Sequence, residues 1–176
     1  VEELTVYPAT EFIFDKTMIE VGKKRISEEF EEYYASLKKQ GKLEEARRLK
    51  EIIGEFLERV GEYHGSVAMD SYVPYFFQHT VSFFDYFTKE NSIFFLDETM
   101  RMDEKAQVVE LEFQEGMAGR LESGYILPSQ TNAIYSYTEL CQKLMSKRLV
   151  MLSTLAHKET NFVAARSYDL TVKSVS

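Results

Sequence analysis

The 176-residue sequence contains a single cysteine, Cys141. One thiol cannot form a disulfide within the chain, so the sequence lacks an internal disulfide framework and suits the reducing cytoplasm. Apolar runs are short, and none approaches the about 20 residues that cross a bilayer. We therefore expect a cytoplasmic protein without a membrane partner. The first residue is Val1 and no basic-then-apolar leader follows it, which predicts an excised piece of a longer protein.

Positive charge is in deficit, with 21 Lys and Arg against 29 Asp and Glu and a net charge of -8. This balance argues against a broad basic surface for nucleic acid, although a local basic patch stays compatible with it. Hydrophobic residues make up 44% of the chain, which is enough to bury one core at this length. We expect one domain, residues 1–176.

A phosphate-binding glycine loop is also missing. P-loop triphosphatases need a G-x-x-x-x-G-K-[ST] turn to cradle phosphates, and this pattern does not occur in the sequence. The nearest Gly-Lys pair, Gly41–Lys42, falls in an expected turn between two helices. The chain alone is therefore expected not to bind ATP well.

Other reactive groups lack partners in the sequence. His64, His79 and His157 are scattered without a second ligand at metal-binding spacing, so no metal site is expected. Cys141 lies among apolar helix positions and is expected to act as a small hydrophobe. Ser153–Thr154 follow an expected strand, but no base is identifiable to activate either hydroxyl. We predict no catalytic residue from these groups.

One strand-like segment ends in two carboxylates. In N-S-I-F-F-L-D-E-T, residues 91–99, four apolar residues are followed at once by Asp97 and Glu98. In a P-loop triphosphatase a buried strand delivers such a pair, with one carboxylate holding magnesium and the other positioning water. Acidic pairs are common at strand ends, so the pair alone is weak evidence for ATP hydrolysis.

Two amphipathic helices joined by a glycine turn are expected within residues 16–61. Asp15 is placed to cap the first helix, which reaches Gln40, and Gly41 follows it. The apolar positions recur mostly every three or four residues, which is typical of an antiparallel helical hairpin. They are Ile19, Ile26, Phe30, Tyr33 and Leu37, then Ala46, Leu49, Ile53, Phe56 and Val60.

The remaining elements alternate between strands and helices, which indicates an α/β fold with a mostly parallel sheet. The continuous apolar character of the last strand predicts burial on both faces of that sheet. The expected strands are 4–14, where Pro8 favours an edge position, 93–96 and 148–155; the expected helices are 103–122 and about 136–147.

Residues 72–87 form the densest aromatic region. Base stacking and packing in a core are the alternative interpretations. We favour packing, because no basic residue is interleaved with these aromatic residues to hold phosphates.

Several segments together resemble the UvrB family of bacterial nucleotide-excision repair. In that family a Y/F-P-A-x-x-F strand precedes a hairpin with Q-G-K-L-x-E-A-x-R-L, followed by L-D-Y-F-P and a Walker-B D-E-S-H strand. The matching residues here are Y-P-A-T-E-F, Gln40–Leu43, Glu45–Ala46, Arg48–Leu49, Asp85–Phe87 and Asp97–Glu98. The resemblance covers nearly the whole chain, and the hairpin motif is its most specific part.

The sequence also departs from that pattern. Ala68–Tyr72 stands at the place of G-I-E-N-Y, Thr99–Met100 replace S-H, and L-S-T-L-A-H stands where helicases have S-A-T-P. The drift resembles the UvrB-like N-terminal region of bacterial transcription-repair coupling factors. The resemblance implies the C-terminal half of a partial RecA-like domain, with Asp97–Glu98 as a degenerate Walker-B-like pair and no cofactor- or metal-binding residue.

For the parent protein the resemblance implies an ATP-dependent, double-stranded DNA translocase that displaces stalled RNA polymerase and recruits UvrA. UvrA would bind a neighbouring domain, and RNA polymerase, DNA, ATP and Mg²⁺ would bind elsewhere in the parent. This chain would be a non-catalytic scaffold without a cofactor of its own. The alternatives are half of an active UvrB-type ATPase or helicase, or an adaptor that binds a partner through the hairpin at residues 16–60.

Overall fold

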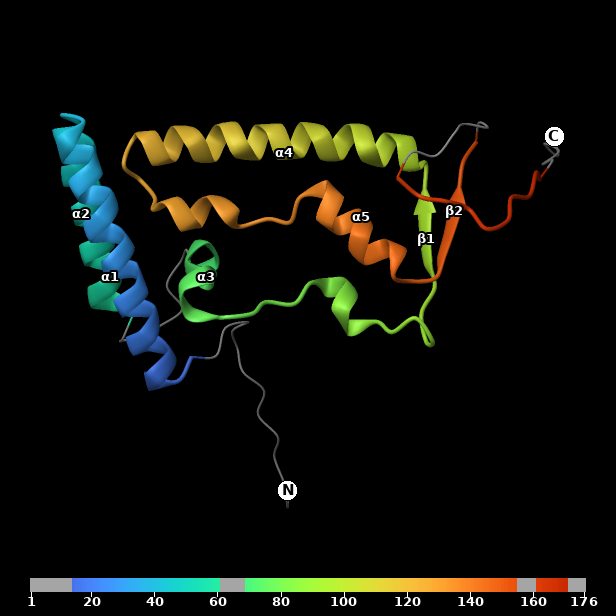
Figure 1. Cartoon of the computed structure of the whole chain (residues 1–176), viewed down its shortest axis with the longest axis horizontal. Helices are drawn as coiled ribbons and strands as arrows, with labels where there is room; N and C mark the ends of the chain where they lie inside the picture. Colours follow the sequence, from blue (N-terminus) through green and yellow to red (C-terminus); the bar gives the residue numbers. More distant parts are fainter. Residues whose placement is uncertain (1–13, 61–68, 155–160, 171–176) are drawn as a thin grey trace, which may run out of the picture. The chain divides into compact units, whose positions relative to one another are not determined.

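The structure, a computed structural model, describes residues 14–60, 69–154 and 161–170 (Figure 1). The chain divides into two compact units, one made of residues 1–80 with 111–134 and the other of residues 81–110 with 135–176. The expected strand at 4–14 lies outside the described residues except for Phe14. The single-domain expectation stays a prediction, because two packing units can belong to one domain. No helix in the described ranges is long and apolar enough to cross a membrane.

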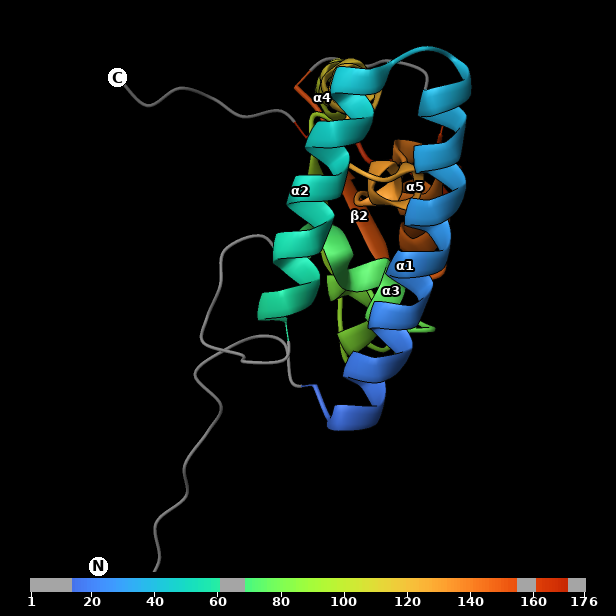
Figure 2. The same cartoon turned by 90° about the vertical axis from the view of Figure 1, so that its left-hand side faces the viewer.

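The helical hairpin is confirmed. Helices α1 (Lys16–Lys39) and α2 (Leu43–Arg59) run side by side in opposite directions (Figure 2). The carboxylate of Asp15 accepts a hydrogen bond from Met18 N at 2.7 Å and thereby caps α1. Gly41 has a φ of +77°, which glycine adopts without strain, and it allows the chain to reverse within a short turn.

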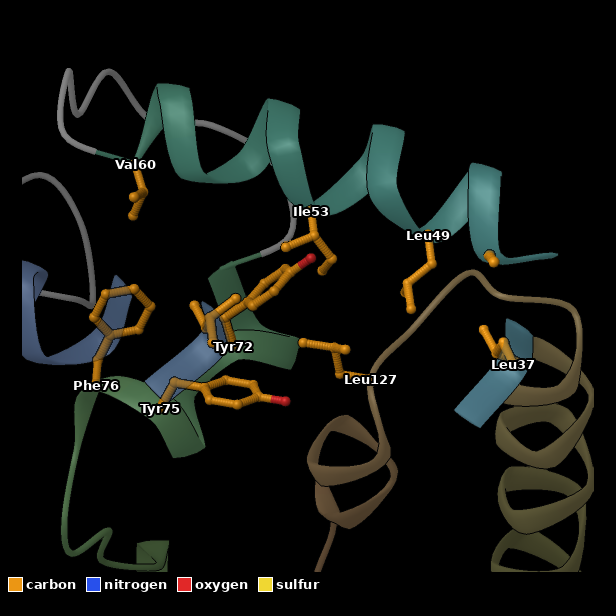
Figure 3. Packing of buried hydrophobic residues seen from close by; sticks show 10 residues of the cluster. Leu37, Leu49, Ile53, Val60, Tyr72, Tyr75, Phe76 and Leu127 are labelled. Carbon is orange, nitrogen blue, oxygen red and sulfur yellow. The ribbon is translucent and has the colours of Figure 1, made fainter. Parts of the chain in front are cut away.

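The core of the first unit forms where the hairpin meets the aromatic segment. A 3₁₀ turn, η1 (Met69–Tyr72), leads into the single-turn helix α3 (Val73–Phe76), and Tyr72 stacks on Phe56 with ring centroids 3.6 Å apart. The packing interpretation is therefore confirmed for this part of the aromatic region. Figure 3 shows most of the buried residues: Ile26, Leu37, Ala46, Leu49, Ile53, Val60, Tyr72, Tyr75, Phe76 and Leu127.

The second unit contains a parallel two-stranded sheet. Strand β1 (Phe94–Asp97) pairs with β2 (Leu149–Leu152) in a register that places Phe94 opposite Leu149 and Asp97 opposite Leu152. Along the chain, helix α4 (Thr99–Glu122) follows β1 and continues into the first unit, which also contains the 3₁₀ turn η3 (Pro128–Asn132); helix α5 (Tyr137–Met145) of the second unit then precedes β2. The expected mixed α/β fold with a parallel sheet and an N-terminal hairpin is confirmed.

Burial of this sheet on both faces is contradicted. On one face Leu96 packs with Cys141, Leu144 and Phe162, whereas Phe95 on the other face is 65% exposed. Val150 and Leu152 share that exposed face, because alternate side chains of a strand point to opposite sides. Within the described part of the chain, helix packing covers one side of the two strands, and continuous apolar sequence does not reveal how many sides are covered.

Candidate functional site at the carboxyl end of the sheet

The acidic pair stands where the two parallel strands end. Asp97 is the last residue of β1 and is exposed, and Glu98 follows it as a partly buried residue. The backbone N–H of Glu98 donates to the carbonyl of Leu152 at 2.9 Å, which extends the sheet pairing by one step. The sequence therefore located this pair correctly at a strand end.

Glu98 has a left-handed backbone, with a φ of +52°. For a residue with a Cβ atom this conformation costs about 1–2 kcal/mol, so surrounding contacts must hold it. Its carbonyl accepts hydrogen bonds from Arg101 N at 2.9 Å and Met102 N at 3.1 Å, which start helix α4. This explains why α4 begins at Thr99, four residues before the Asp103 start expected from periodicity.

The side chain of Glu98 connects the ends of both strands. Its Oε1 atom accepts a hydrogen bond from Thr154 N at 2.9 Å and another from the Thr154 hydroxyl. Thr154 lies two residues beyond β2, so the Glu98 carboxylate fastens the segment after β2 to the end of β1. The sequence singled out Ser153–Thr154 only as hydroxyls without a base, and it gave no signal for this long-range contact.

The chemistry available around Asp97 is limited. Its exposed carboxylate can supply an oxygen ligand of the type that Mg²⁺ prefers. Across residues 14–60, 69–154 and 161–170, no group of three or more His, Cys, Asp or Glu residues has the geometry to hold a metal ion. No glycine loop of the P-loop type exists in the sequence to hold the phosphates. That this chain has no nucleotide site of its own therefore stays a prediction.

The D-Y-F motif overlaps a turn in the second unit that side-chain hydrogen bonds attach to α5. Residues Phe83–Tyr86 make the 3₁₀ turn η2, and Asp85 Oδ2 accepts hydrogen bonds from Ser82 N at 2.6 Å and Lys143 Nζ at 2.9 Å. Lys143, followed by Ser82, holds the pKa of the Asp85 carboxyl well below its usual range. Lys147 Nζ also donates to the carbonyl of Phe87 at 2.6 Å. Asp85 therefore joins this turn to α5.

The hairpin motif holds the first unit together at the end of α4. Arg48 donates to the carbonyl of Ser123 and lies over the ring of Tyr125, 4.7 Å from its centroid. Gly124 has a φ of +71° and approaches the backbone of Glu45 so closely that a Cβ atom would overlap its carbonyl. These contacts give Glu45 and Arg48 of the motif a structural role.

The other residues considered from the sequence are not brought together. Cys141 is buried in the core of the second unit, and burial raises the pKa of its thiol, which confirms its role as a small hydrophobe. His79 is exposed on the segment after α3. His64 and His157 lie outside the described residues.

Comparison with known proteins gives one limited similarity. No family model matches the chain. The UvrABC system protein B of Streptococcus gordonii is 35% identical to it over 72 residues, which is 41% of this chain and 11% of that protein. The chain thus spans about a tenth of the length of this relative. The match supports a UvrB-like relationship over those 72 residues.

Proposed function

We propose that this chain is a non-catalytic scaffold segment in the UvrB-like module of a transcription-repair coupling factor. The observation that carries the proposal is the hydrogen bonding of Glu98, whose carboxylate accepts from both the N–H and the hydroxyl of Thr154. The similarity to UvrABC system protein B supports the UvrB-like part of the assignment. The departures from the family motifs support the coupling-factor part.

The Glu98 contact matters because of what hydrolysis requires. A triphosphatase needs its second carboxylate free to orient the attacking water, and it needs a loop that holds the phosphates. Glu98 instead uses an oxygen to fasten Thr154, and the sequence has no such loop. Under this proposal the acidic pair stabilises the sheet, and ATP and Mg²⁺ act in another part of the parent protein.

The two alternatives are less well supported. An adaptor that binds a partner through the hairpin could not use its apolar seam, because Leu49 and Ile53 are fully buried in the first unit, and it would have to bind through the exposed charged face. Half of an active ATPase would need a G-K-[ST] loop elsewhere in the parent sequence. Under the scaffold proposal the segment supports a neighbouring domain that recruits UvrA, and other domains bind RNA polymerase and double-stranded DNA in the cytoplasm.

Calorimetric titration of Mg-ATP into the complete UvrB-like module tests the proposal. We expect no binding heat at millimolar nucleotide, because the chain supplies no phosphate loop. In the full-length parent, the double substitution Asp97→Asn with Glu98→Gln should leave repair coupling near the wild-type level. The glutamine amide keeps a carbonyl oxygen that accepts from Thr154, so this variant removes the charge and preserves the contact.

Two results would overturn the scaffold role. One is clear Mg-ATP binding that disappears in Asp97→Asn, which would indicate a working nucleotide site. The other is a loss of repair coupling in the double variant that is as complete as in a parent protein whose ATP-dependent translocase has been inactivated. Thr154→Val is the control that weakens the contact instead of the charges. It removes the hydroxyl hydrogen bond to Glu98 and leaves the carboxylates of Asp97 and Glu98 in place.

A further inference from the structure

One apolar face of the β1–β2 sheet is exposed. Phe95 is 65% exposed, and Val150, its partner in the sheet register, is 37% exposed. Because the side chains of a strand alternate between its two faces, Ile93 and Leu152 lie on the same face, and they are 54% and 46% exposed. Parallel sheets are normally covered on both faces, and adjoining exposed apolar side chains mark a surface for interaction. This face of the sheet is therefore suited to bind a partner.

Opposite charges stand at the two ends of this face. Arg148 directly precedes β2 and lies beside the start of β1, because its carbonyl accepts a hydrogen bond from Phe94 N at 2.9 Å. Asp97 is the last residue of β1. The same alternation places Asp97 on the face of Phe95 and Arg148 on the face of Val150. Both charged side chains are exposed, and neither forms a salt bridge with another described residue.

The surface formed by these side chains is complementary to a copy of itself. We call it the open face, and it consists of Ile93, Phe95, Asp97, Arg148, Val150 and Leu152. When two sheets pack face to face across a two-fold axis perpendicular to their strands, the strands of one copy run opposite to those of the other. The positive end of each open face then meets the negative end of the other copy, and the apolar side chains meet between these ends.

We propose that the open face binds a second copy of this chain and forms a dimer with two-fold symmetry. Arg148 of each copy pairs with Asp97 of the other. The apolar side chains of both open faces are removed from water. The two ion pairs select the antiparallel orientation, and the apolar contacts supply most of the affinity. The inference rests on the sheet of the second unit alone and is independent of the scaffold proposal.

Two features predict that this dimer is weak. Each copy contributes few apolar side chains, because β1 and β2 are only four residues long, so the buried area falls below that of standard stable interfaces. Each chain also carries a net charge of -8, so the two copies repel one another as they approach. We therefore expect a dissociation constant of roughly 10 μM to 1 mM, which concentrated solutions of the chain can reach.

Sedimentation equilibrium over a range of chain concentrations tests the proposal. The 176-residue chain should change from monomer to dimer as its concentration rises. Phe95→Glu should raise the dissociation constant about 30-fold or more, because a two-fold interface loses the burial of two rings. Phe83→Glu is the matched control, since Phe83 is 69% exposed, lies in η2 outside both strands, and its substitution changes the net charge equally. This control should leave dimerisation unchanged.

A mixture of two charge-reversal variants tests the orientation of the copies. In a dimer of Arg148→Glu the new glutamate faces Asp97 twice, and in a dimer of Asp97→Lys the new lysine faces Arg148 twice. Each variant alone should therefore dimerise more weakly than the wild type. In the mixed dimer both contacts join opposite charges, so it should form about two- to 30-fold more tightly than either variant with itself. Both positions are exposed, so this test does not depend on whether Phe95→Glu folds.

Three results would overturn the proposal. A chain that stays monomeric up to about 1 mM has no such interface, and another polypeptide segment then covers the open face. Dimerisation that persists in Phe95→Glu, or that weakens equally in Phe83→Glu, would place the contact elsewhere on the chain. Charge-reversal variants that associate no better when mixed than alone would exclude the antiparallel pairing of Arg148 with Asp97.

Discussion

Gly124 shows how one residue position can limit the packing of a whole motif. Its φ of +71° and its close approach to the carbonyl of Glu45 leave no room for a side chain. Gly124→Ala should lower the free energy of unfolding by about 1–3 kcal/mol, because it adds both backbone strain and a steric overlap. Urea denaturation of the purified chain measures this change.

Gly119 supplies the matched control for that substitution. It lies within α4, and an added Cβ there would meet nothing within 4 Å. Gly119→Ala should raise the free energy of unfolding by about 0.5–1 kcal/mol, since alanine is the better helix former. Equal effects of the two substitutions would contradict the assignment of Gly124 as a packing contact with α2.

At the residue scale, the sequence predicted where individual side chains lie more reliably than which residues they contact. Asp97 and Glu98 were placed at a strand end because an apolar run and two acids are adjacent in the chain. The contact with Thr154 joins residues 56 positions apart, and no local pattern encodes it. The lysines that meet Asp85 and Phe87 were missed for the same reason.

At the scale of elements, the stability that the Asp85–Lys143 contact gives to the packing of η2 on α5 should depend on pH. The pKa of Asp85 in the folded chain lies well below its ordinary value of 3.8, chiefly because Lys143 donates to it. A lowered folded pKa stabilises the fold at pH values above the unfolded pKa. The stabilisation should therefore be fully present above about pH 4 and decline as the pH falls below that value.

Comparison of the wild-type chain with Asp85→Asn measures this dependence. The difference in free energy of unfolding should be constant near neutral pH and should shrink as the pH is lowered from about 4. Glu58→Gln is a suitable control, because Glu58 is an exposed acid of α2. A difference that grows on acidification would show that Asp85 is not paired in the folded state.

Elements were predicted well where their signals are local. The cap at Asp15, the turn at Gly41 and the alternating apolar spacing fixed the hairpin because each acts within a few residues. The start of α4 was misplaced, since it depends on the unusual backbone of Glu98. The burial of β1 and β2 was misjudged, because it depends on which other elements cover the sheet.

At the scale of the whole molecule, the two units have separate hydrophobic clusters. Leu49 is buried in the first and Leu144 in the second. Leu49→Ala should lower the free energy of unfolding by about 2–5 kcal/mol. It should also accelerate amide hydrogen exchange in α1 and α2, while the amides of α5 stay protected. Leu144→Ala should have the reciprocal effect. Hydrogen exchange followed by mass spectrometry resolves these segments.

Each variant is the control for the other, because both truncate a buried leucine of the same size. Exchange that accelerates uniformly through the chain in both variants would mean that the units unfold as one cooperative body. Leu43→Ala, at an exposed position of α2, should leave exchange unchanged throughout.

The hydrogen bonds between Glu98 and Thr154 have a consequence for how such sequences drift over evolutionary time. A carboxylate whose hydrogen bonds hold the ends of two strands together is selected for folding, whether or not it also takes part in a reaction. Once a phosphate loop is lost, substitutions at purely catalytic positions become neutral, yet this glutamate still carries a penalty for replacement. An acidic pair at a strand end can therefore be kept for folding alone, so its presence does not by itself establish ATP hydrolysis.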